Sequence, residues 1–173
     1  KKVSKKLLSQ YFQEGFPKGD ITTSILKKIN NKMIYADIIT CEDMVFVGKP
    51  IILSAFKSKQ NAVVMKAKDG QKIKKGFKIC TIYAHYRELL KKERVVLNLI
   101  QHMSGVASFV WQLSTKSNKK NIKILDTRKT TPGIRILEKY AVYHGGGINH
   151  RLNLSEGILI KDNHIALYNN LEE

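Results

Sequence analysis

The spacing of the apolar residues changes at residue 86, and this change restricts the fold more than any other feature of the sequence. Between residues 32 and 85, short apolar stretches separated by turn residues are typical of strands. They follow one another too closely for a crossover helix between every pair, so the sheet is expected to be largely antiparallel. From residue 86 the apolar positions recur at helical spacing as far as Leu113, which predicts one long amphipathic helix with Gly105 as the candidate for a break.

The same patterns give the bounds of the other elements. Before the long helix, the expected ranges are helices 3–14 and 50–56 and strands 33–40, 44–47, 62–66 and 77–83, the first two strands being joined by a reversal. After a polar loop at 117–121 the expected order is strand 122–125, helix 132–141, glycine loop 145–147 and strand 158–160. The last strand is uniformly apolar and is expected to be buried on both faces, so a parallel α/β arrangement begins in this half.

Lysine and arginine outnumber aspartate and glutamate by 31 to 14, which gives a formal charge of +17. Three explanations are open: a lysine-rich surface without a partner, anionic small-molecule ligands, or nucleic acid. The lysines are scattered through the chain as pairs and do not form one concentrated stripe. This distribution favours the first two explanations, and we expect no nucleic-acid partner.

The sequence also indicates where the chain works. Its two cysteines, Cys41 and Cys80, form no C-x-x-C motif and no Cys/His cluster, as expected for a reduced, cytoplasmic compartment. The basic N-terminus runs into Ser9 and Gln10 without the apolar stretch of a secretory signal. The longest apolar runs are a handful of residues, so we expect no membrane partner.

Cationic side chains follow two predicted strands of the second half and the glycine loop between them. In α/β sheets and barrels, ligands bind at the carboxyl ends of the strands. One rim should therefore carry Arg128, Lys129, His150, Arg151 and Lys161. Each of these taken singly is typical of a solvated loop, but their joint occurrence predicts a polyanionic ligand, because Arg and Lys pair with carboxylate or phosphate and glycines let backbone N–H groups approach an anion.

Several runs of the sequence carry a more specific pattern. In the second half they are DTRKTTPG at 126–133, EKYAV at 138–142, GGGINHR at 145–151 and ILIKDNH at 158–164. Earlier in the chain they are GDITT at 19–23, ERVVLN at 93–98 and MSGVA at 103–107. In this order they strongly resemble the quinolinate phosphoribosyltransferase family, also called nicotinate-nucleotide pyrophosphorylase (carboxylating), over nearly the whole chain.

The resemblance implies a fold of two parts. An N-terminal α/β sandwich domain with the linking helix would span 1–104, and the first part of a parallel α/β barrel would span 105–173. It also implies a homodimer or a hexamer of dimers, in which each active site joins one subunit's barrel to its neighbour's N-terminal domain. The implied reaction joins quinolinate to phosphoribosyl pyrophosphate and gives nicotinate mononucleotide, diphosphate and CO2 for NAD synthesis, with Mg²⁺ bound to the diphosphate.

The resemblance also assigns roles to residues of this chain. The implied catalytic residues are Lys129 and Lys161, which would face the phosphoribosyl and diphosphate groups or the reacting centre. The quinolinate carboxylates would be held by Arg128, His150 and Arg151 together with Arg94 of the partner subunit, although Arg94 judged from its surroundings alone is a helix-surface residue. Thr127 completes the substrate-binding set, and no metal ligand is expected within this chain.

The implied chemistry suits these residue types. Quinolinate carries two adjacent carboxylates and its cosubstrate several phosphate charges, so a cationic cradle is needed to bring them together. The pyridine nitrogen attacks the ribose anomeric carbon as diphosphate leaves, and the resulting pyridinium withdraws electrons and eases loss of the neighbouring carboxylate as CO2. No covalent nucleophile on the enzyme is needed, because positioning and charge stabilisation carry the catalysis.

The sequence departs from the family at its C-terminal end. The family continues past the position of Glu173 with most of its barrel, which holds the acidic residues that meet Mg²⁺ and the glycine-rich segment for the 5′-phosphate. We therefore expect a fragment of a longer enzyme or a truncated gene product, with an open sheet edge and no turnover in isolation even if quinolinate binds weakly. Two alternatives stay open: a paralogous phosphoribosyltransferase-like protein of the molybdenum-transport type, and a non-catalytic binding protein of the same fold.

Overall fold

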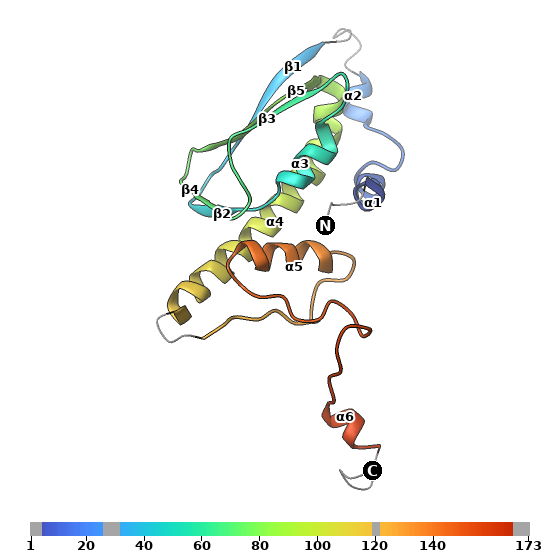
Figure 1. Cartoon of the computed structure of the whole chain (residues 1–173). Helices are drawn as coiled ribbons and strands as arrows, with labels where there is room; N and C mark the ends of the chain where they lie inside the picture. Colours follow the sequence, from blue (N-terminus) through green and yellow to red (C-terminus); the bar gives the residue numbers. More distant parts are fainter. Residues whose placement is uncertain (1–4, 26–31, 119–121, 168–173) are drawn as a thin grey trace.

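One long helix runs through the whole body of the protein and connects its two halves (Figure 1). The computed structural model describes residues 5–25, 32–118 and 122–167. A sheet with two helices lies on the first part of the long helix, and a shorter helix with an extended segment lies on its last part. A C-terminal arm leaves the body and carries a final short helix. None of the described helices is long and apolar enough to cross a membrane.

The strands of the first half pair antiparallel, as predicted. Strands β1 (Met33–Ile39), β5 (Lys78–His85) and β3 (Ala62–Met65) form one sheet in the order β1-β5-β3. Strands β2 (Met44–Phe46) and β4 (Gln71–Ile73) form a separate antiparallel pair. The expected reversal between the first two strands is therefore wrong, because β1 and β2 belong to different sheets. Strand β4 was not predicted, since three residues between two turns are too short to show a period.

Helices cover one face of the sheet. Helix α1 (Lys5–Gly15) packs on α3 (Lys49–Phe56), which has Pro50 in its first turn as predicted, and both pack on the long helix. Helix α2 (Ile21–Ile25) precedes the sheet. The core between these layers contains side chains with almost no exposed surface, among them Phe46, Ile51, Ile52, Phe56, Cys80 and Ile82. The apolar alternation of the strands thus points one row of side chains towards the helices.

Helix α4 (Tyr86–Asn118) is continuous for 33 residues, so the break expected at Gly105 is wrong. Glycine lowers helix stability without ending a helix, and the buried face runs past it through Val96, Ile100, Met103, Ala107 and Val110. Two serines of α4 also hold β2. The Ser108 hydroxyl accepts a hydrogen bond from the Val45 amide at 2.8 Å, and the Ser104 hydroxyl accepts one from the Val47 amide at 3.0 Å.

Helix α5 (Arg135–His144) joins the second half to the first, and replaces the helix expected at 132–141. Its Tyr140 hydroxyl donates a hydrogen bond to Asp69 at 2.6 Å, and the other oxygen of Asp69 accepts from the amides of Gly48 and Lys49 at the start of α3. Burial, with the nearby Asp69 carboxylate, raises the pKa of Tyr140. The two halves are therefore connected by directional bonds as well as by packing.

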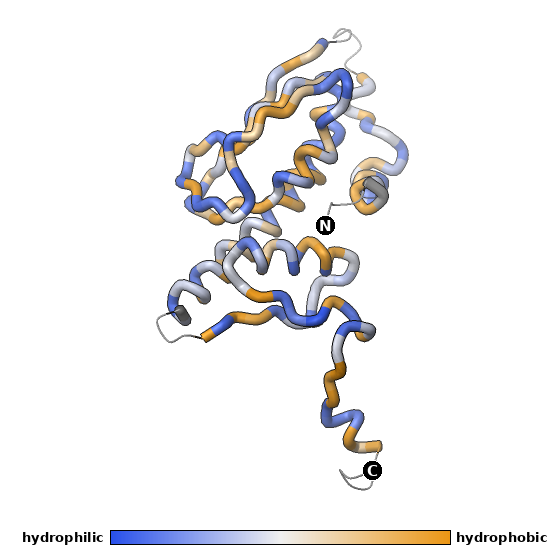
Figure 2. Tube along the Cα trace, in the orientation of Figure 1, coloured by the Kyte–Doolittle hydropathy of each residue, from blue (hydrophilic) through white to orange (hydrophobic). Residues whose placement is uncertain are grey.

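The predicted strands of the second half are only partly formed. The stretch 122–125 contributes a single parallel bridge between Leu125 and Ile148. The stretch 158–160 forms no strand, and Ile158 and Ile160 are 95% and 69% exposed, so the expected burial on both faces is wrong. Within the described residues no strand lies beside this stretch to supply ladder bonds or a packed layer. Figure 2 shows the apolar stretch in the arm that ends in α6 (Asp162–Ile165). The α/β fold class is nevertheless confirmed by the mixture of elements.

Substitution by alanine should have opposite effects on stability at two glycines: Gly105 within α4, and Gly145, which follows α5 and packs against α4. A Cβ at Gly145 would lie 2.5 Å from the Ala107 carbonyl oxygen and 2.9 Å from Val110, whereas a Cβ at Gly105 would meet nothing within 4 Å. We expect Gly145→Ala to lower the free energy of unfolding by about 2 kcal/mol through overpacking. Gly105→Ala should raise it by about 0.5–1 kcal/mol through helix propensity. Urea unfolding followed by circular dichroism measures both, and equal effects would contradict the packing described for the α4–α5 contact.

Candidate active site

The predicted cationic residues of the second half meet in one hollow of about 260 Å³. It lies where the strand end at 124–127, the segment after the glycine loop and the start of the arm come together. Its lining is Asp126, Thr127, Arg128, Lys129, His150, Arg151, Leu159 and Lys161. Six of these eight are the residues of this chain that the sequence assigned to substrate. The structure thus brings them together, and their individual roles stay predictions.

Arg94 is the one predicted site residue that lies elsewhere. It stands on α4 with an exposed side chain and does not line the hollow. Its predicted role was to act from a partner subunit, so its distance from the hollow of its own chain leaves that prediction open.

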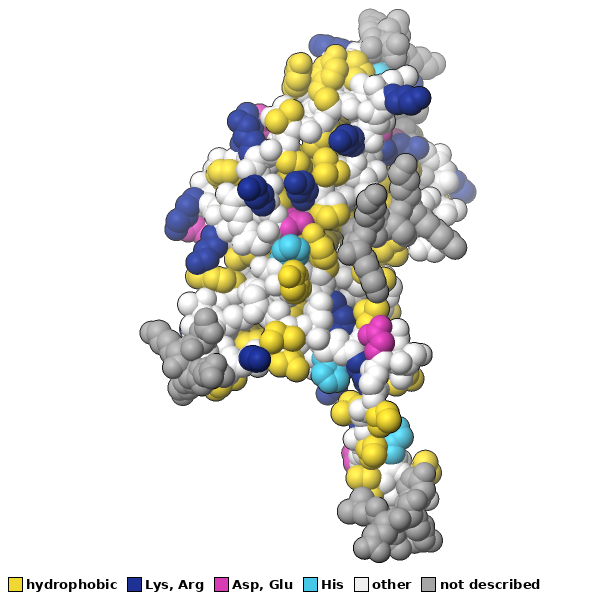
Figure 3. All heavy atoms as spheres, viewed as in Figure 1, with side chains coloured by type: hydrophobic (Ala, Val, Ile, Leu, Met, Phe, Trp, Pro, Cys, Tyr) yellow, Lys and Arg dark blue, Asp and Glu magenta, His cyan; other side chains and the backbone are white. Residues whose placement is uncertain are grey.

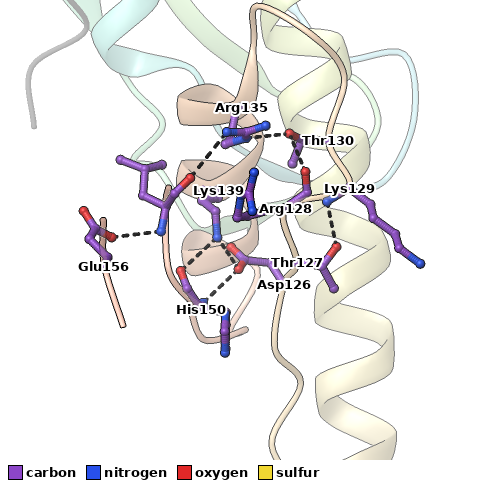
Figure 4. A network of polar contacts seen from close by, with 10 residues as sticks. Asp126, Thr127, Arg128, Lys129, Thr130, Arg135, Lys139, His150 and Glu156 are labelled. Atoms are coloured by element: carbon purple, nitrogen blue, oxygen red, sulfur yellow. Dashed lines mark hydrogen bonds and ion pairs between the residues drawn. The ribbon is translucent and has the colours of Figure 1, made fainter. Parts of the chain in front are cut away.

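The hollow has an excess of positive charge. Arg128, Lys129, Arg151 and Lys161 line it, and among the described residues none of them forms an ion pair with an acidic side chain. The Arg151 guanidinium donates to the Gly157 carbonyl at 3.0 Å, which ties the start of the arm to the hollow. In Figure 4 the Lys129 side chain extends away from the other labelled residues. Because no acidic side chain of the described residues neutralises these four cations, their charge is available to an anionic ligand.

Arg128 has a nitrogen that lacks a partner. Its Nε is buried and makes no hydrogen bond within the described part of the protein. A buried donor without an acceptor costs free energy. The Arg128 side chain also lines the hollow, and a guanidinium matches a carboxylate or phosphate that would bind there.

A buried ion pair lies beneath the hollow (Figure 4). The ammonium of Lys139, on α5, contacts Asp126 Oδ1 at 2.5 Å, and the two side chains are only 5% and 6% exposed. Lys139 also donates to the His150 carbonyl at 2.9 Å, and the His150 amide donates to Asp126 Oδ1 at 2.8 Å. The Asn149 amide, in the orientation that satisfies its neighbours, donates to Asp126 Oδ2 at 2.7 Å.

Two more residues of α5 hold the loop at 127–133. The Arg135 Nε donates to the Thr130 hydroxyl at 2.9 Å. Glu138 accepts from the Thr131 amide at 3.1 Å and contacts His102 of α4 at 3.0 Å. Burial opposes ionisation of Glu138, but its hydrogen bonds from Thr131 and His102 outweigh this effect and lower its pKa. Helix α5 therefore holds the backbone around the hollow, and none of its residues lines the hollow.

Sequence reasoning assigned no role to Asp126, Arg135, Glu138 or Lys139, although three of the four stood in the quoted runs. A signal was present for Lys139. It lies among Leu137, Ala141 and Val142 on the buried side of α5, where a charged residue requires a partner. The identity of that partner depends on how the strand end packs against α5, which local sequence does not encode.

The described residues do not form a metal centre. No group of three or more His, Cys, Asp or Glu side chains in 5–25, 32–118 and 122–167 is arranged to hold a metal ion. Asp126 is the one carboxylate lining the hollow, and its two oxygens already accept three hydrogen bonds. It therefore does not fit the role of a Mg²⁺ ligand.

Two family models match the chain. The model of the quinolinate phosphoribosyl transferase N-terminal domain matches residues 20–104, and that of the C-terminal domain matches residues 106–173. The chain belongs to the quinolinate phosphoribosyl transferase family. The resemblance found in the sequence runs is confirmed.

Relatives and solved structures agree with this family. The chain is 43% identical over 164 residues to the probable nicotinate-nucleotide pyrophosphorylase (carboxylating) of Bacillus subtilis, a match that covers 94% of this chain and 56% of that protein. It is 48% identical over 106 residues to the Mycobacterium leprae protein, covering 60% of this chain and 37% of that one. The structure of nicotinate-nucleotide pyrophosphorylase from Ehrlichia chaffeensis superposes with a TM-score of 0.92 at 38% identity, covering 99% of this chain and 64% of that one. The chain thus spans little more than half the length of the Bacillus subtilis relative.

The lowered pKa of Glu138 predicts a pH-dependent contribution to stability. A carboxylate whose pKa falls on folding stabilises the protein above its unfolded pKa, ordinarily 4.5, and loses this effect as the pH falls through the folded value. We expect Glu138→Gln to destabilise by about 1 kcal/mol at pH 7, and the difference in melting temperature to shrink progressively below pH 4.5. Exposed Glu93 of α4 provides the matched control, Glu93→Gln. A pH-independent difference for Glu138→Gln would contradict the role of its charge.

Proposed function

We propose that this chain forms the quinolinate-binding part of a quinolinate phosphoribosyltransferase of NAD biosynthesis. The reaction transfers the phosphoribosyl group of phosphoribosyl pyrophosphate to quinolinate and releases diphosphate and CO2, leaving nicotinate mononucleotide. The family and the relatives support this activity, which remains a proposal because the chain spans 56% of the Bacillus subtilis protein. The observation that carries it is the hollow lined by Arg128, Lys129, His150, Arg151 and Lys161, in which the four Lys and Arg side chains have no acidic partner among the described residues.

The charge of the hollow matches the charge of the ligand. Quinolinate brings two carboxylates on adjacent ring carbons, and two planar guanidiniums can each bind one of them with two hydrogen bonds. Arg128 and Arg151 are the two guanidiniums that line the hollow. We assign the carboxylates to them, to His150 and to Arg94 of the partner subunit. Lys129 and Lys161 are left to face the phosphate groups of the cosubstrate, with Thr127 at the same strand end.

Catalysis in this proposal is a matter of charge and orientation. Binding holds the pyridine nitrogen towards the anomeric carbon, whose bond to diphosphate breaks as the new C–N bond forms. The bond between the ring and the adjacent carboxylate then breaks, its electron pair passes to the ring, and a proton replaces CO2. Cations fixed before the reaction stabilise the departing diphosphate without reorganisation.

Mg²⁺ is proposed to enter with the diphosphate of the cosubstrate. The described residues supply no set of ligands for it. The family resemblance is the basis for proposing a homodimer or a hexamer of dimers, and the exposed position of Arg94 on α4, outside the hollow of its own chain, is compatible with a role in a partner's site.

Removing either arginine of the hollow should weaken quinolinate binding. We expect Arg128→Ala and Arg151→Ala each to raise the dissociation constant at least tenfold, because each loses a charge-assisted contact worth about 2–5 kcal/mol when buried. Isothermal titration calorimetry with quinolinate measures this. Lys78→Ala is the matched control, since Lys78 pairs with Asp37 on the sheet, away from the hollow. Wild-type affinity in both arginine variants would remove the basis of the proposed function.

The shared site predicts complementation between two inactive variants. In an enzyme of the full family length, Arg94→Ala and Arg128→Ala should each lose most activity. A mixture should recover part of it, because hybrid dimers contain one site with neither substitution. A coupled assay for nicotinate mononucleotide measures the recovery. No recovery, with subunit exchange demonstrated by mass spectrometry, would contradict the role of Arg94 across the interface.

A further inference from the structure

The side chains that line the hollow depend on a backbone that one ion pair holds in place. We propose that the buried Lys139–Asp126 pair is the positioning element of the anion-binding hollow and that neither residue contacts the ligand. The inference rests on the proposed function, because quinolinate is taken as the ligand. Its geometry comes from the hydrogen bonds of His150.

The pair holds both backbone groups of His150. Its N–H donates to Asp126 Oδ1 at 2.8 Å, and its carbonyl accepts from Lys139 Nζ at 2.9 Å. Asn149, one residue earlier, donates to the other oxygen of Asp126 at 2.7 Å and to the Lys139 carbonyl at 2.9 Å. With its backbone held on both sides, His150 has a fixed Cα–Cβ direction, and the backbone position from which Arg151 starts is held as well.

The same pair sets the distance between the two arginines. Asp126 stands two positions before Arg128 on the strand end, and His150 stands one position before Arg151. The two segments otherwise meet through the Leu125–Ile148 bridge, with hydrogen bonds from the Asp126 amide to the Ile148 carbonyl at 3.1 Å and from the Ile148 amide to the Ile124 carbonyl at 2.8 Å. A shift of about 1 Å between such groups is enough to spoil a two-pronged carboxylate contact.

Neither member of the pair is available for catalysis. Asp126 lines a cationic hollow, where a free carboxylate would be a candidate base, but its oxygens accept three hydrogen bonds and its side chain is 6% exposed. Lys139 uses two of its three N–H donors on Asp126 and His150. Because the two charges cancel, the pair leaves the net charge of the hollow unchanged.

Stability alone does not require such a pair. Burying two charges is costly, and replacing a buried ion pair by neutral groups of similar volume is often neutral or stabilising. What a neutral replacement removes is the set of directional bonds among the strand end, α5 and the glycine loop. The pair is therefore expected to matter more for ligand geometry than for folding.

The test is the apolar double variant Asp126→Leu/Lys139→Met, which keeps the approximate shape of both side chains and removes every polar group of the pair. We expect a melting temperature close to that of the wild type, a quinolinate dissociation constant at least tenfold higher, and amide hydrogen exchange at His150 at least tenfold faster. Asp37→Leu/Lys78→Met, the same change in the more exposed pair of the sheet, should alter neither affinity nor exchange at His150. Unchanged affinity and exchange in a folded double variant would overturn the inference.

A double-mutant cycle separates positioning from a general structural effect. In an Arg151→Ala background the same double substitution should cost less than threefold in affinity, because the group it positions is already gone. A full tenfold loss there would overturn the assignment. If the double variant does not fold, Lys139→Arg serves, because it keeps the two buried charges balanced but changes the geometry of the contacts to Asp126 and the His150 carbonyl. The expected loss of affinity is about threefold, and an unchanged affinity again overturns the inference.

Failure of the proposed function has a different signature. Wild-type protein that does not bind quinolinate contradicts the function. The inference is then decided by hydrogen exchange at His150, which needs no ligand, and by the affinity for inorganic phosphate in the same variants.

Discussion

The buried face of α4 is the constraint on which the rest of the structure depends. Its residues from Val96 to Ile100 pack under the sheet, and those from Ala107 to Val110 meet the glycine turn that follows α5. The contact at Gly145 is so close that no side chain fits there. Because one rigid helix carries both contacts, the sheet and the hollow keep a fixed relation although few residues connect them directly. The few that do include Tyr140 with Asp69, and Tyr11 of α1, whose hydroxyl donates to the Gly133 carbonyl at 3.0 Å.

The net charge of +17 divides into two parts with different meaning. On the face seen in Figure 3, Lys and Arg lie scattered over the sheet half. In that half, Lys74 pairs with Asp43 and Lys78 with Asp37 at the surface. Exposed pairs of this kind contribute little to stability. The cations of the hollow differ because they converge without acidic partners among the described residues. The concentration of unpaired charge, and not its total, is what supports an anionic ligand.

Sequence reasoning succeeded where the information is local. Antiparallel strands, α3 with its early proline, and the long helix follow from periodicity. Five residues of the hollow follow from the rule that strand ends meet at one edge, and Thr127 follows from the family resemblance. It failed where the outcome depends on distant neighbours. Gly105 stays helical because the buried residues of α4 before and after it pack against the sheet and against the turn that follows α5. The 158–160 stretch is exposed because no described strand or helix lies over it to bury it. Lys139 finds Asp126 thirteen positions earlier in the chain, a pairing that only the fold creates.

The arm has a consequence for how these residues, taken as an isolated chain, behave in solution. Residues 158–160 are Ile, Leu and Ile, and within the described part of the chain their backbone makes no hydrogen bond. An extended apolar segment with free N–H and C=O groups is a template for intermolecular pairing, so it favours self-association at high concentration. The charged residues Lys161 and Asp162 follow at once, and such flanking charges act as gatekeepers that limit stacking. The same lysine that is proposed to face the cosubstrate is therefore also one of the two charges expected to limit pairing at this segment.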